Sequence, residues 1–203
     1  MIRNIVFDMG QVLIRWRPEE MLERFDLSQE EKTMLLQELF WSPEWIAQDR
    51  GIITEADMIA RVSARLPETL HGTVEEVIKA WYVWHLTPMP GMAELVRELK
   101  EKGYGIYLLS NASTALRGYF PRIPGSECFD GLMVSAEEKL LKPQHEIYER
   151  LYERFGLVPE QCVFIDDSPA NIEGAMLTGM QGIVFRGDTE RLRRELRALG
   201  IMV

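Results

Sequence analysis

Polar side chains stand at several points of this sequence where buried strands would end or a helix would begin. The set offers carboxylates, a hydroxyl, an amide and an ammonium, which together can bind a divalent cation and a phosphate. Its members are Asp8, Ser110, Asn111, Lys142, Asp166 and Asp167.

The chemistry that this set predicts is phosphoryl transfer. Two or three carboxylates supply the hard oxygen ligands that Mg²⁺ prefers, and they leave coordination positions for water and a substrate phosphate. A serine hydroxyl and a lysine ammonium can hold the remaining phosphate oxygens. A carboxylate such as that of Asp8, held beside the phosphorus, can attack in line and form an aspartyl-phosphate.

Each of these residues also has a simpler interpretation when it is considered alone. Asp8 could merely end its strand, and Lys142 could be a solvated residue at a helix start. The sequence Asp166-Asp167-Ser168-Pro169 could be a well-capped turn. Their recurrence in this order, on these elements, favours a shared site over separate caps.

The elements that would position these residues alternate between helical and strand patterns. After a linker at Thr87-Pro88-Met89-Pro90-Gly91, amphipathic segments separate short apolar runs. Such alternation predicts an α/β fold with a Rossmann-like, doubly wound parallel sheet, whose strands end at one shared edge. The expected strands are Ile5–Phe7, Ile106–Leu109, Gly131–Val134, Val163–Ile165 and Gly182–Phe185.

A mainly helical region interrupts this pattern after the first strand. Ser28 and Glu31 have capping-box spacing, and Thr54 marks a further helix start. We therefore expect an α/β core of residues 1–14 and 88–203, with a helical subdomain of residues 15–87 inserted into it.

All five tryptophans lie in the helical region. Large aromatic side chains often fill the core of a small helical bundle, and this is the role we expect for Trp41, Trp81 and Trp84. Trp16 and Trp45 flank segment boundaries and could instead line a pocket.

The composition narrows the range of partners. The 203 residues carry a formal net charge of -9, so there is no excess of basic residues to neutralise a nucleic-acid backbone. No apolar stretch approaches the length of a membrane span, and the two cysteines, Cys128 and Cys162, lack metal-ligand spacing. We expect a cytoplasmic protein without nucleic-acid or membrane partners.

The polar set and its strands resemble the haloacid dehalogenase superfamily of hydrolases. The similarity extends over essentially the whole chain, and the helical region stands where the family has a small helical cap. The four matching motifs are Ile5–Asp8, Leu108–Asn111, Lys142-Pro143 and Phe164–Asn171.

The resemblance implies a role for each residue of the polar set. It makes Asp8 the nucleophile and a Mg²⁺ ligand, gives a backbone ligand at Gly10, and places Asp167 with Asp166 at the metal. The phosphate of a small-molecule ester would then be held by Ser110, Asn111 and Lys142.

The helical region resembles caps of the same superfamily. Asp49-Arg50-Gly51-Ile52-Ile53-Thr54 is similar to a loop that is often found there, and Arg50 could reach a substrate or support its own helix. The motifs and the cap length resemble a subgroup that includes a bacterial α-glucose-1-phosphate phosphatase.

Gly10 departs from the family pattern, in which most phosphatases carry a second Asp that protonates the leaving oxygen. General acid–base catalysis is typically worth about 10²–10⁴-fold in rate. A water molecule or Gln11 could transfer the proton, or the protein could bind without catalysing. We favour a substrate with a good leaving group, such as a sugar 1-phosphate.

The leading hypothesis is therefore a Mg²⁺-dependent phosphatase that acts through an aspartyl-phosphate. A 2-haloacid dehalogenase would also use an attacking Asp but needs no metal, and the adjacent acids Asp166 and Asp167 argue against it. The third hypothesis, a non-catalytic binding protein on the same fold, rests on Gly10 alone.

Overall fold

The computed structural model describes residues 1–203 and contains a five-stranded parallel sheet. The strand order is β5-β4-β1-β6-β7, so the first strand of the chain lies at the centre of the sheet. The strands are β1 (Asn4–Phe7), β4 (Gly105–Ser110), β5 (Gly131–Val134), β6 (Cys162–Asp166) and β7 (Gln181–Val184).

The central strands are buried on both faces because their side chains alternate between two hydrophobic clusters. Ile5 and Phe7 of β1 join the larger cluster, whereas Val6 joins the smaller one. Continuous apolar runs such as these are what a sheet covered on both sides requires. The predicted α/β class with a doubly wound parallel sheet is confirmed.

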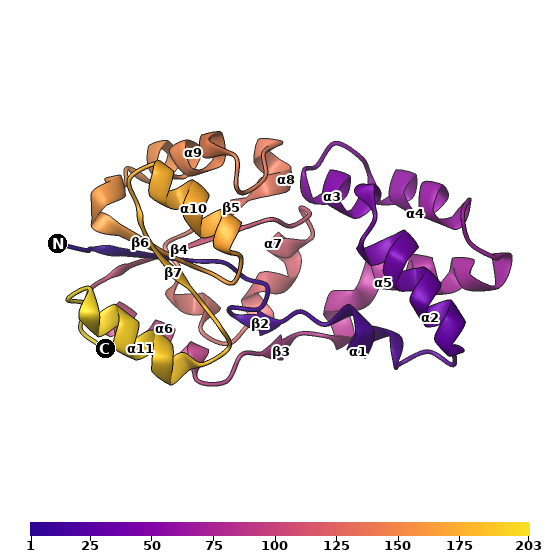
Figure 1. The fold of residues 1–203 in the computed structure, drawn as a ribbon, viewed down its shortest axis with the longest axis horizontal. Helices are drawn as coiled ribbons and strands as arrows, with labels where there is room; N and C mark the ends of the chain where they lie inside the picture. Colours follow the sequence, from indigo (N-terminus) through magenta and orange to yellow (C-terminus); the bar gives the residue numbers. More distant parts are fainter.

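Helices cover the two faces of the sheet (Figure 1). α9 and α10 pack over the smaller cluster, and α6 and α11 lie on the opposite face. These outer helices and two short ones near the sheet edge are α6 (Met92–Glu101), α7 (Leu116–Tyr119), α8 (Ser135–Glu138), α9 (His145–Phe155), α10 (Pro169–Leu177) and α11 (Thr189–Ala198).

The remaining helices form a separate group beyond one end of the sheet (Figure 1). Capping boxes at Ser28 and Thr54 start two of them, as the spacing of Ser28 and Glu31 predicts. The helices are α1 (Pro18–Leu22), α2 (Gln29–Leu35), α3 (Pro43–Asp49), α4 (Glu55–Ser63) and α5 (His71–Trp84).

The chain enters and leaves this helical group through two adjacent segments. β2 (Ile14–Arg15) and β3 (Thr87–Pro88) pair antiparallel, and the backbone N–H of Met89 donates to the Leu13 carbonyl at 2.9 Å. The expected linker is thus a short two-stranded ribbon that ties both crossings together.

Two details of the sequence-based expectations differ from the structure. The simpler interpretation of Lys142 as a solvated residue at a helix start is wrong, because α9 begins only at His145 and Lys142 is buried. The prediction that Trp41 packs in a core is wrong, because its side chain is 62 % exposed. Leu39 and Phe40 occupy the buried positions of the preceding turn, so Trp41 projects away from the core.

Candidate active site

Three of the predicted site residues meet in direct contact at the carboxyl ends of β1 and β6. The Lys142 ammonium lies 2.8 Å from Asp8 Oδ1 and 2.6 Å from Asp166 Oδ2. It also donates to the backbone carbonyl of Leu109 at 3.0 Å. These three acceptors match the three N–H donors of a lysine ammonium, so its position is fixed.

Asp166 is fully buried, and both of its carboxylate oxygens accept hydrogen bonds. The backbone N–H of Ser168 donates to Oδ1 at 2.8 Å, and Asn171 Nδ2 lies 3.1 Å from each oxygen. The turn after β6 therefore wraps around this carboxylate. Asp166 is a satisfied internal charge that orients Lys142.

Asn111 makes a pair of hydrogen bonds with the backbone of Lys142. Its Oδ1 accepts from the Lys142 N–H at 2.8 Å, and its Nδ2 donates to the Lys142 carbonyl at 3.1 Å. The side chain thus joins the end of β4 to the segment that carries the lysine. In this arrangement Asn111 positions Lys142, and its predicted contact with phosphate stays a prediction.

Burial and neighbouring charges shift the titration of the nucleophile candidate. Burial raises the pKa of Asp8 to about 7, with a further increase from Asp166, while Lys142 acts in the opposite direction. Burial lowers the pKa of Lys142, but the attraction of Asp8 and Asp166 outweighs it, and the net pKa is raised. A single ammonium does not fully balance the two carboxylates.

The acidic cluster suits a divalent cation. Asp8, Asp166 and Asp167 each offer a carboxylate oxygen, and these oxygens lie within 4.8 Å of one another. Three carboxylates beside one ammonium leave about two negative charges to be compensated, which is the charge that Mg²⁺ carries. The donor set therefore fits the ion that the resemblance implies.

Asp167 differs from its neighbour because the residue is exposed. Its carboxylate is partly shielded from water, which raises its pKa, and the negative charge of Asp166 raises it further. With Asp166 already bound by internal donors, Asp167 is the acid of the pair that is more accessible to a cation.

A cavity of about 150 Å³ opens above Asp8, between the sheet edge and the helical group. Gly10, Ser110, Asn111 and Lys142 line it from the core side. The opposite wall comes from the helical group, is mainly aromatic and includes three of the tryptophans that the sequence assigned to core packing or to a pocket. Its lining residues are Trp16, Trp45, Gln48, Asp49, Ile78 and Trp81, and Tyr119 of α7 adds a further ring from the core.

Arg50 is the one predicted site residue that takes no part in this cavity or its acidic cluster. It is absent from the lining, and its Nε is buried without a hydrogen-bond partner. The substrate contact proposed for Arg50 stays a prediction.

The sequence-based set left out several residues that the structure brings to the site. Asn171 stands in the fourth motif but was not assigned a role, although its amide binds Asp166. Gln48 and Asp49 also line the cavity, at the end of α3. The sequence gives only one indication of this, a polar pair that follows Trp45 after about one helical turn.

Comparison with known proteins decides the family. The family model described as "Hydrolase: haloacid dehalogenase-like hydrolase" matches residues 2–176. The chain is a haloacid dehalogenase-like hydrolase. The predicted superfamily membership and hydrolase class are thereby confirmed.

Curated relatives of this haloacid dehalogenase-like hydrolase are mostly phosphatases. The sesquiterpene phosphatase astK of Aspergillus oryzae is 26 % identical over 181 residues, covering 88 % of this chain and 87 % of the relative. Flavin mononucleotide hydrolase 1 of Arabidopsis thaliana is 25 % identical over 159 residues, covering 78 % and 63 % of the two chains. These relatives support a hydrolase of the phosphatase type.

Solved structures share the whole architecture. The magnesium complex of the enzyme bt-2542 from Bacteroides thetaiotaomicron is 25 % identical, with a TM-score of 0.71 over 95 % of this chain and 98 % of that one. YfnB from Bacillus subtilis, also bound to magnesium, has a TM-score of 0.74 at 17 % identity over 97 % and 99 %, which shows the fold alone.

Proposed function

We propose that this hydrolase is a Mg²⁺-dependent phosphatase that cleaves a small phosphate ester through an aspartyl-phosphate on Asp8. The observation that carries the proposal is the Lys142 ammonium held between Asp8 and Asp166 at the cavity that Asp8 and Lys142 line. Asp8, Asp167 and the backbone carbonyl of Gly10 would hold the cation. When bound, Mg²⁺ would neutralise charge on the phosphate and on the carboxylates.

The residues of the core then divide the work of the first step. An oxygen of Asp8 attacks the phosphorus, the bond to the leaving oxygen breaks, and an aspartyl-phosphate forms. Lys142 stabilises the negative charge shared by Asp8 and the phosphate. Ser110, which is buried and lines the cavity, donates its hydroxyl proton to a phosphate oxygen. Water then cleaves the acyl-phosphate and regenerates Asp8.

The helical group, residues 15–87, would act as the cap of a core formed by residues 1–14 and 88–203. The cavity of about 150 Å³ is smaller than the roughly 300–1,000 Å³ of pockets for drug-sized ligands, which favours a small substrate. Its aromatic wall suits a compact organic group with an apolar face. A sugar 1-phosphate, which the sequence favours, is one such candidate.

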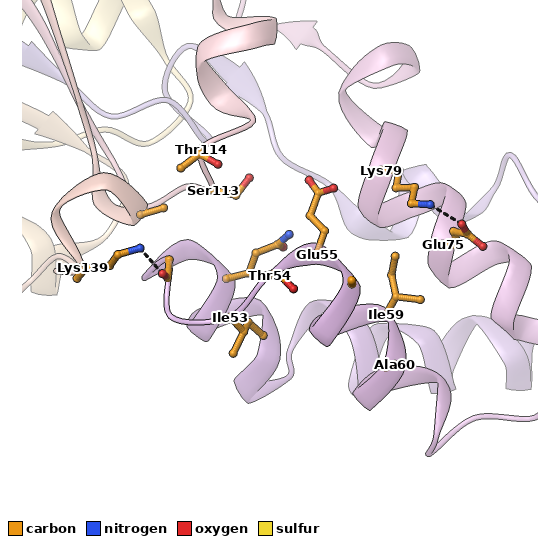
Figure 2. Close-up of a pocket in the computed structure, with 14 residues that line it drawn as sticks. Ile53, Thr54, Glu55, Ile59, Ala60, Glu75, Lys79, Ser113, Thr114 and Lys139 are labelled. Atoms are coloured by element: carbon orange, nitrogen blue, oxygen red, sulfur yellow. Dashed lines mark hydrogen bonds and ion pairs between the residues drawn. The ribbon is translucent and has the colours of Figure 1, made fainter.

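A second, larger cavity of about 760 Å³ adjoins the first and shares Gln48 and Ser113 with it. Residues of α4 and α5 line it from the helical group (Figure 2). Ser113, Thr114 and Lys139 line it from the core. None of the predicted catalytic, phosphate-binding or metal-binding residues lines it. This cavity is the route by which we expect substrate to enter.

A phosphate-release screen over small phosphorylated metabolites, with and without Mg²⁺, tests the proposal. We expect turnover that needs the metal and that falls by about 10⁴–10⁶-fold in Asp8→Asn, as when a covalent nucleophile is removed. Absence of turnover on every ester would favour the non-catalytic binding protein.

A halide-release assay separates the dehalogenase alternative. A haloacetate dehalogenase of Moraxella is 30 % identical over 97 residues, but the match covers only 47 % of this chain and 43 % of the relative. Release of halide from a 2-haloacid that survives chelation of metals would favour this alternative. The cluster of three acids favours the phosphatase.

The partner and location predictions remain those of the sequence. None of the helices is both long and apolar enough to cross a membrane. We expect small phosphate esters, and no nucleic acid, as partners, and the cytoplasmic location stays a prediction from composition.

A further inference from the structure

Besides the nucleophile Asp8, the core side of the cavity offers no carboxyl that could protonate the leaving oxygen. Gly10 has none, and Gln11 does not line the cavity above Asp8. The side-chain Oε1 of Gln11 instead accepts a hydrogen bond from the backbone N–H of Trp16 at 3.1 Å. Proton transfer by Gln11, one of the explanations left open by the sequence, has no support in this geometry.

The leaving oxygen of the proposed reaction departs on the side of the phosphorus that faces away from the core. In-line displacement puts the attacking oxygen of Asp8 and the leaving oxygen on opposite sides of the phosphorus. Because Asp8 stands at the sheet edge, the leaving oxygen faces the wall of the cavity formed by the helical group. A proton donor for that oxygen must therefore come from this wall.

Asp49 is the only carboxyl besides Asp8 that lines the cavity. It is the last residue of α3, and the core fixes its backbone: Ser135 Oγ donates to the Asp49 carbonyl at 2.5 Å. Two residues later, Lys139 Nζ donates to the Gly51 carbonyl. The side chain is thus held over the site by contacts that cross from cap to core.

The surroundings of Asp49 favour its protonated form. Burial raises its pKa well above the ordinary value, and the charge of Asp8 adds to this, while hydrogen bonding from Ser113 and Trp45 acts in the opposite direction. The negative end of α3 also disfavours a carboxylate at its last residue. Lys142 and Tyr119 are the other titratable groups that line this cavity.

We propose that Asp49 is the general acid and base of this hydrolase, in place of the side chain that Gly10 lacks. When the bond between Asp8 and phosphorus forms and the ester bond breaks, the carboxyl proton of Asp49 passes to the leaving oxygen. The resulting Asp49 carboxylate then takes a proton from the attacking water, which releases phosphate and free Asp8. This inference rests on the proposed phosphatase function.

Two esters of similar shape test the inference. p-Nitrophenyl phosphate has a leaving group that needs no proton, whereas the alcohol of benzyl phosphate does. In Asp49→Asn we expect kcat/KM to fall by about 10²–10⁴-fold on benzyl phosphate and by less than about tenfold on p-nitrophenyl phosphate. Asp26→Asn, the same change at an exposed carboxylate of the helical group that lines neither cavity, should leave both unchanged.

A rescue separates lost chemistry from lost structure. A Cβ at Gly10 would lie 3.8 Å from its nearest neighbour, Trp16 Cβ, and the φ of Gly10 is outside the left-handed region, so Gly10→Asp can be accommodated. We expect the double variant with Asp49→Asn to regain at least about tenfold on benzyl phosphate, a modest part of what an acid supplies.

The contrary outcomes are equally distinct. Equal losses on both esters in Asp49→Asn, without rescue, would make Asp49 a structural residue and overturn the inference. So would a wild type that cleaves p-nitrophenyl phosphate but not benzyl phosphate, because it would have no working donor. A wild type that hydrolyses no phosphate ester overturns the proposed function itself.

Discussion

The two walls of the cavity are built in different ways. On the core side, Lys142 makes hydrogen bonds with Asp166 and with Asn111 at the carboxyl edge of the sheet. On the cap side, aromatic rings dominate, and the one carboxylate reaches the site through contacts of Ser135 and Lys139 with the end of α3. The charged residues that would bind phosphate lie at one edge of the sheet and contact one another directly. The wall that faces the leaving group comes from a separate group of helices.

Because the two walls come from different parts of the chain, phosphate binding and leaving-group chemistry can be altered independently. Mutations at the sheet edge should change the free energy of unfolding, because they leave buried charges without a partner. Mutations in the cap wall should change activity by altering the contact of α3 with the core or the protonation of Asp49.

Loss of Lys142 should have the largest effect. In Lys142→Met, Asp8 and Asp166 stay buried without their counter-ion, so we expect the free energy of unfolding to fall by about 3–5 kcal/mol near neutral pH. The loss should shrink as the pH is lowered, because protonated carboxyls need no counter-ion. Urea denaturation measures it, and Lys79→Met, at an exposed pair with Glu75, should unfold like the wild type.

Binding of Mg²⁺ should stabilise the core edge. At a concentration about 100 times its dissociation constant, the ion should add about 2.7 kcal/mol to the free energy of unfolding. Thermal melting with and without chelator measures this gain. In Asp167→Asn the gain should be much reduced, and an unchanged gain would exclude Asp167 as a ligand.

A substitution at Gly51 tests whether the contact between the end of α3 and α8 matters for activity. Its φ of 70° is in the left-handed region, and a Cβ there would collide with the Ala136 carbonyl, so Gly51→Ala should push the end of α3 away from α8. The left-handed conformation alone costs an alanine about 1–2 kcal/mol. We expect lower stability together with a fall in kcat/KM.

Gly72 provides the matched control on the same group of helices. It lies in α5 with open space where a Cβ would stand, and its φ is not positive. Gly72→Ala should therefore stabilise the protein by about 0.5–1 kcal/mol and leave activity intact. A similar loss of activity in both variants would mean that the seating of α3 on α8 is not what matters.

The smallest expected effect is a pH dependence at the cap wall. Because burial raises the pKa of Asp49, its stabilising contribution is complete below the ordinary value of 3.8 and is lost as the pH rises through the raised pKa. Asn does not titrate. The melting temperature of Asp49→Asn relative to the wild type should therefore increase as the pH rises from the ordinary value of 3.8 through the raised pKa. A constant difference would contradict the raised pKa.

Much of the core could be predicted from the sequence, because strand patterns and chain order carry that information locally. Ile5–Phe7 and Val163–Ile165 are apolar runs that end in acids, and parallel strands bring their ends to one edge. The convergence of Asp8 and Asp166 follows from that rule, whereas Lys142 reaches them from the segment between α8 and α9. The family motifs then supplied the expected chemistry.

The cap wall was decided by tertiary structure alone. Short amphipathic helices show which face is buried but not which helix turns toward the core, so Trp41 was assigned to a core although it is exposed. Asp49 has no motif of its own, and its place above Asp8 depends on the contact of α3 with Ser135, 86 residues later in the chain. Local sequence specified the nucleophile, whereas only long-range packing could put a proton donor opposite to it.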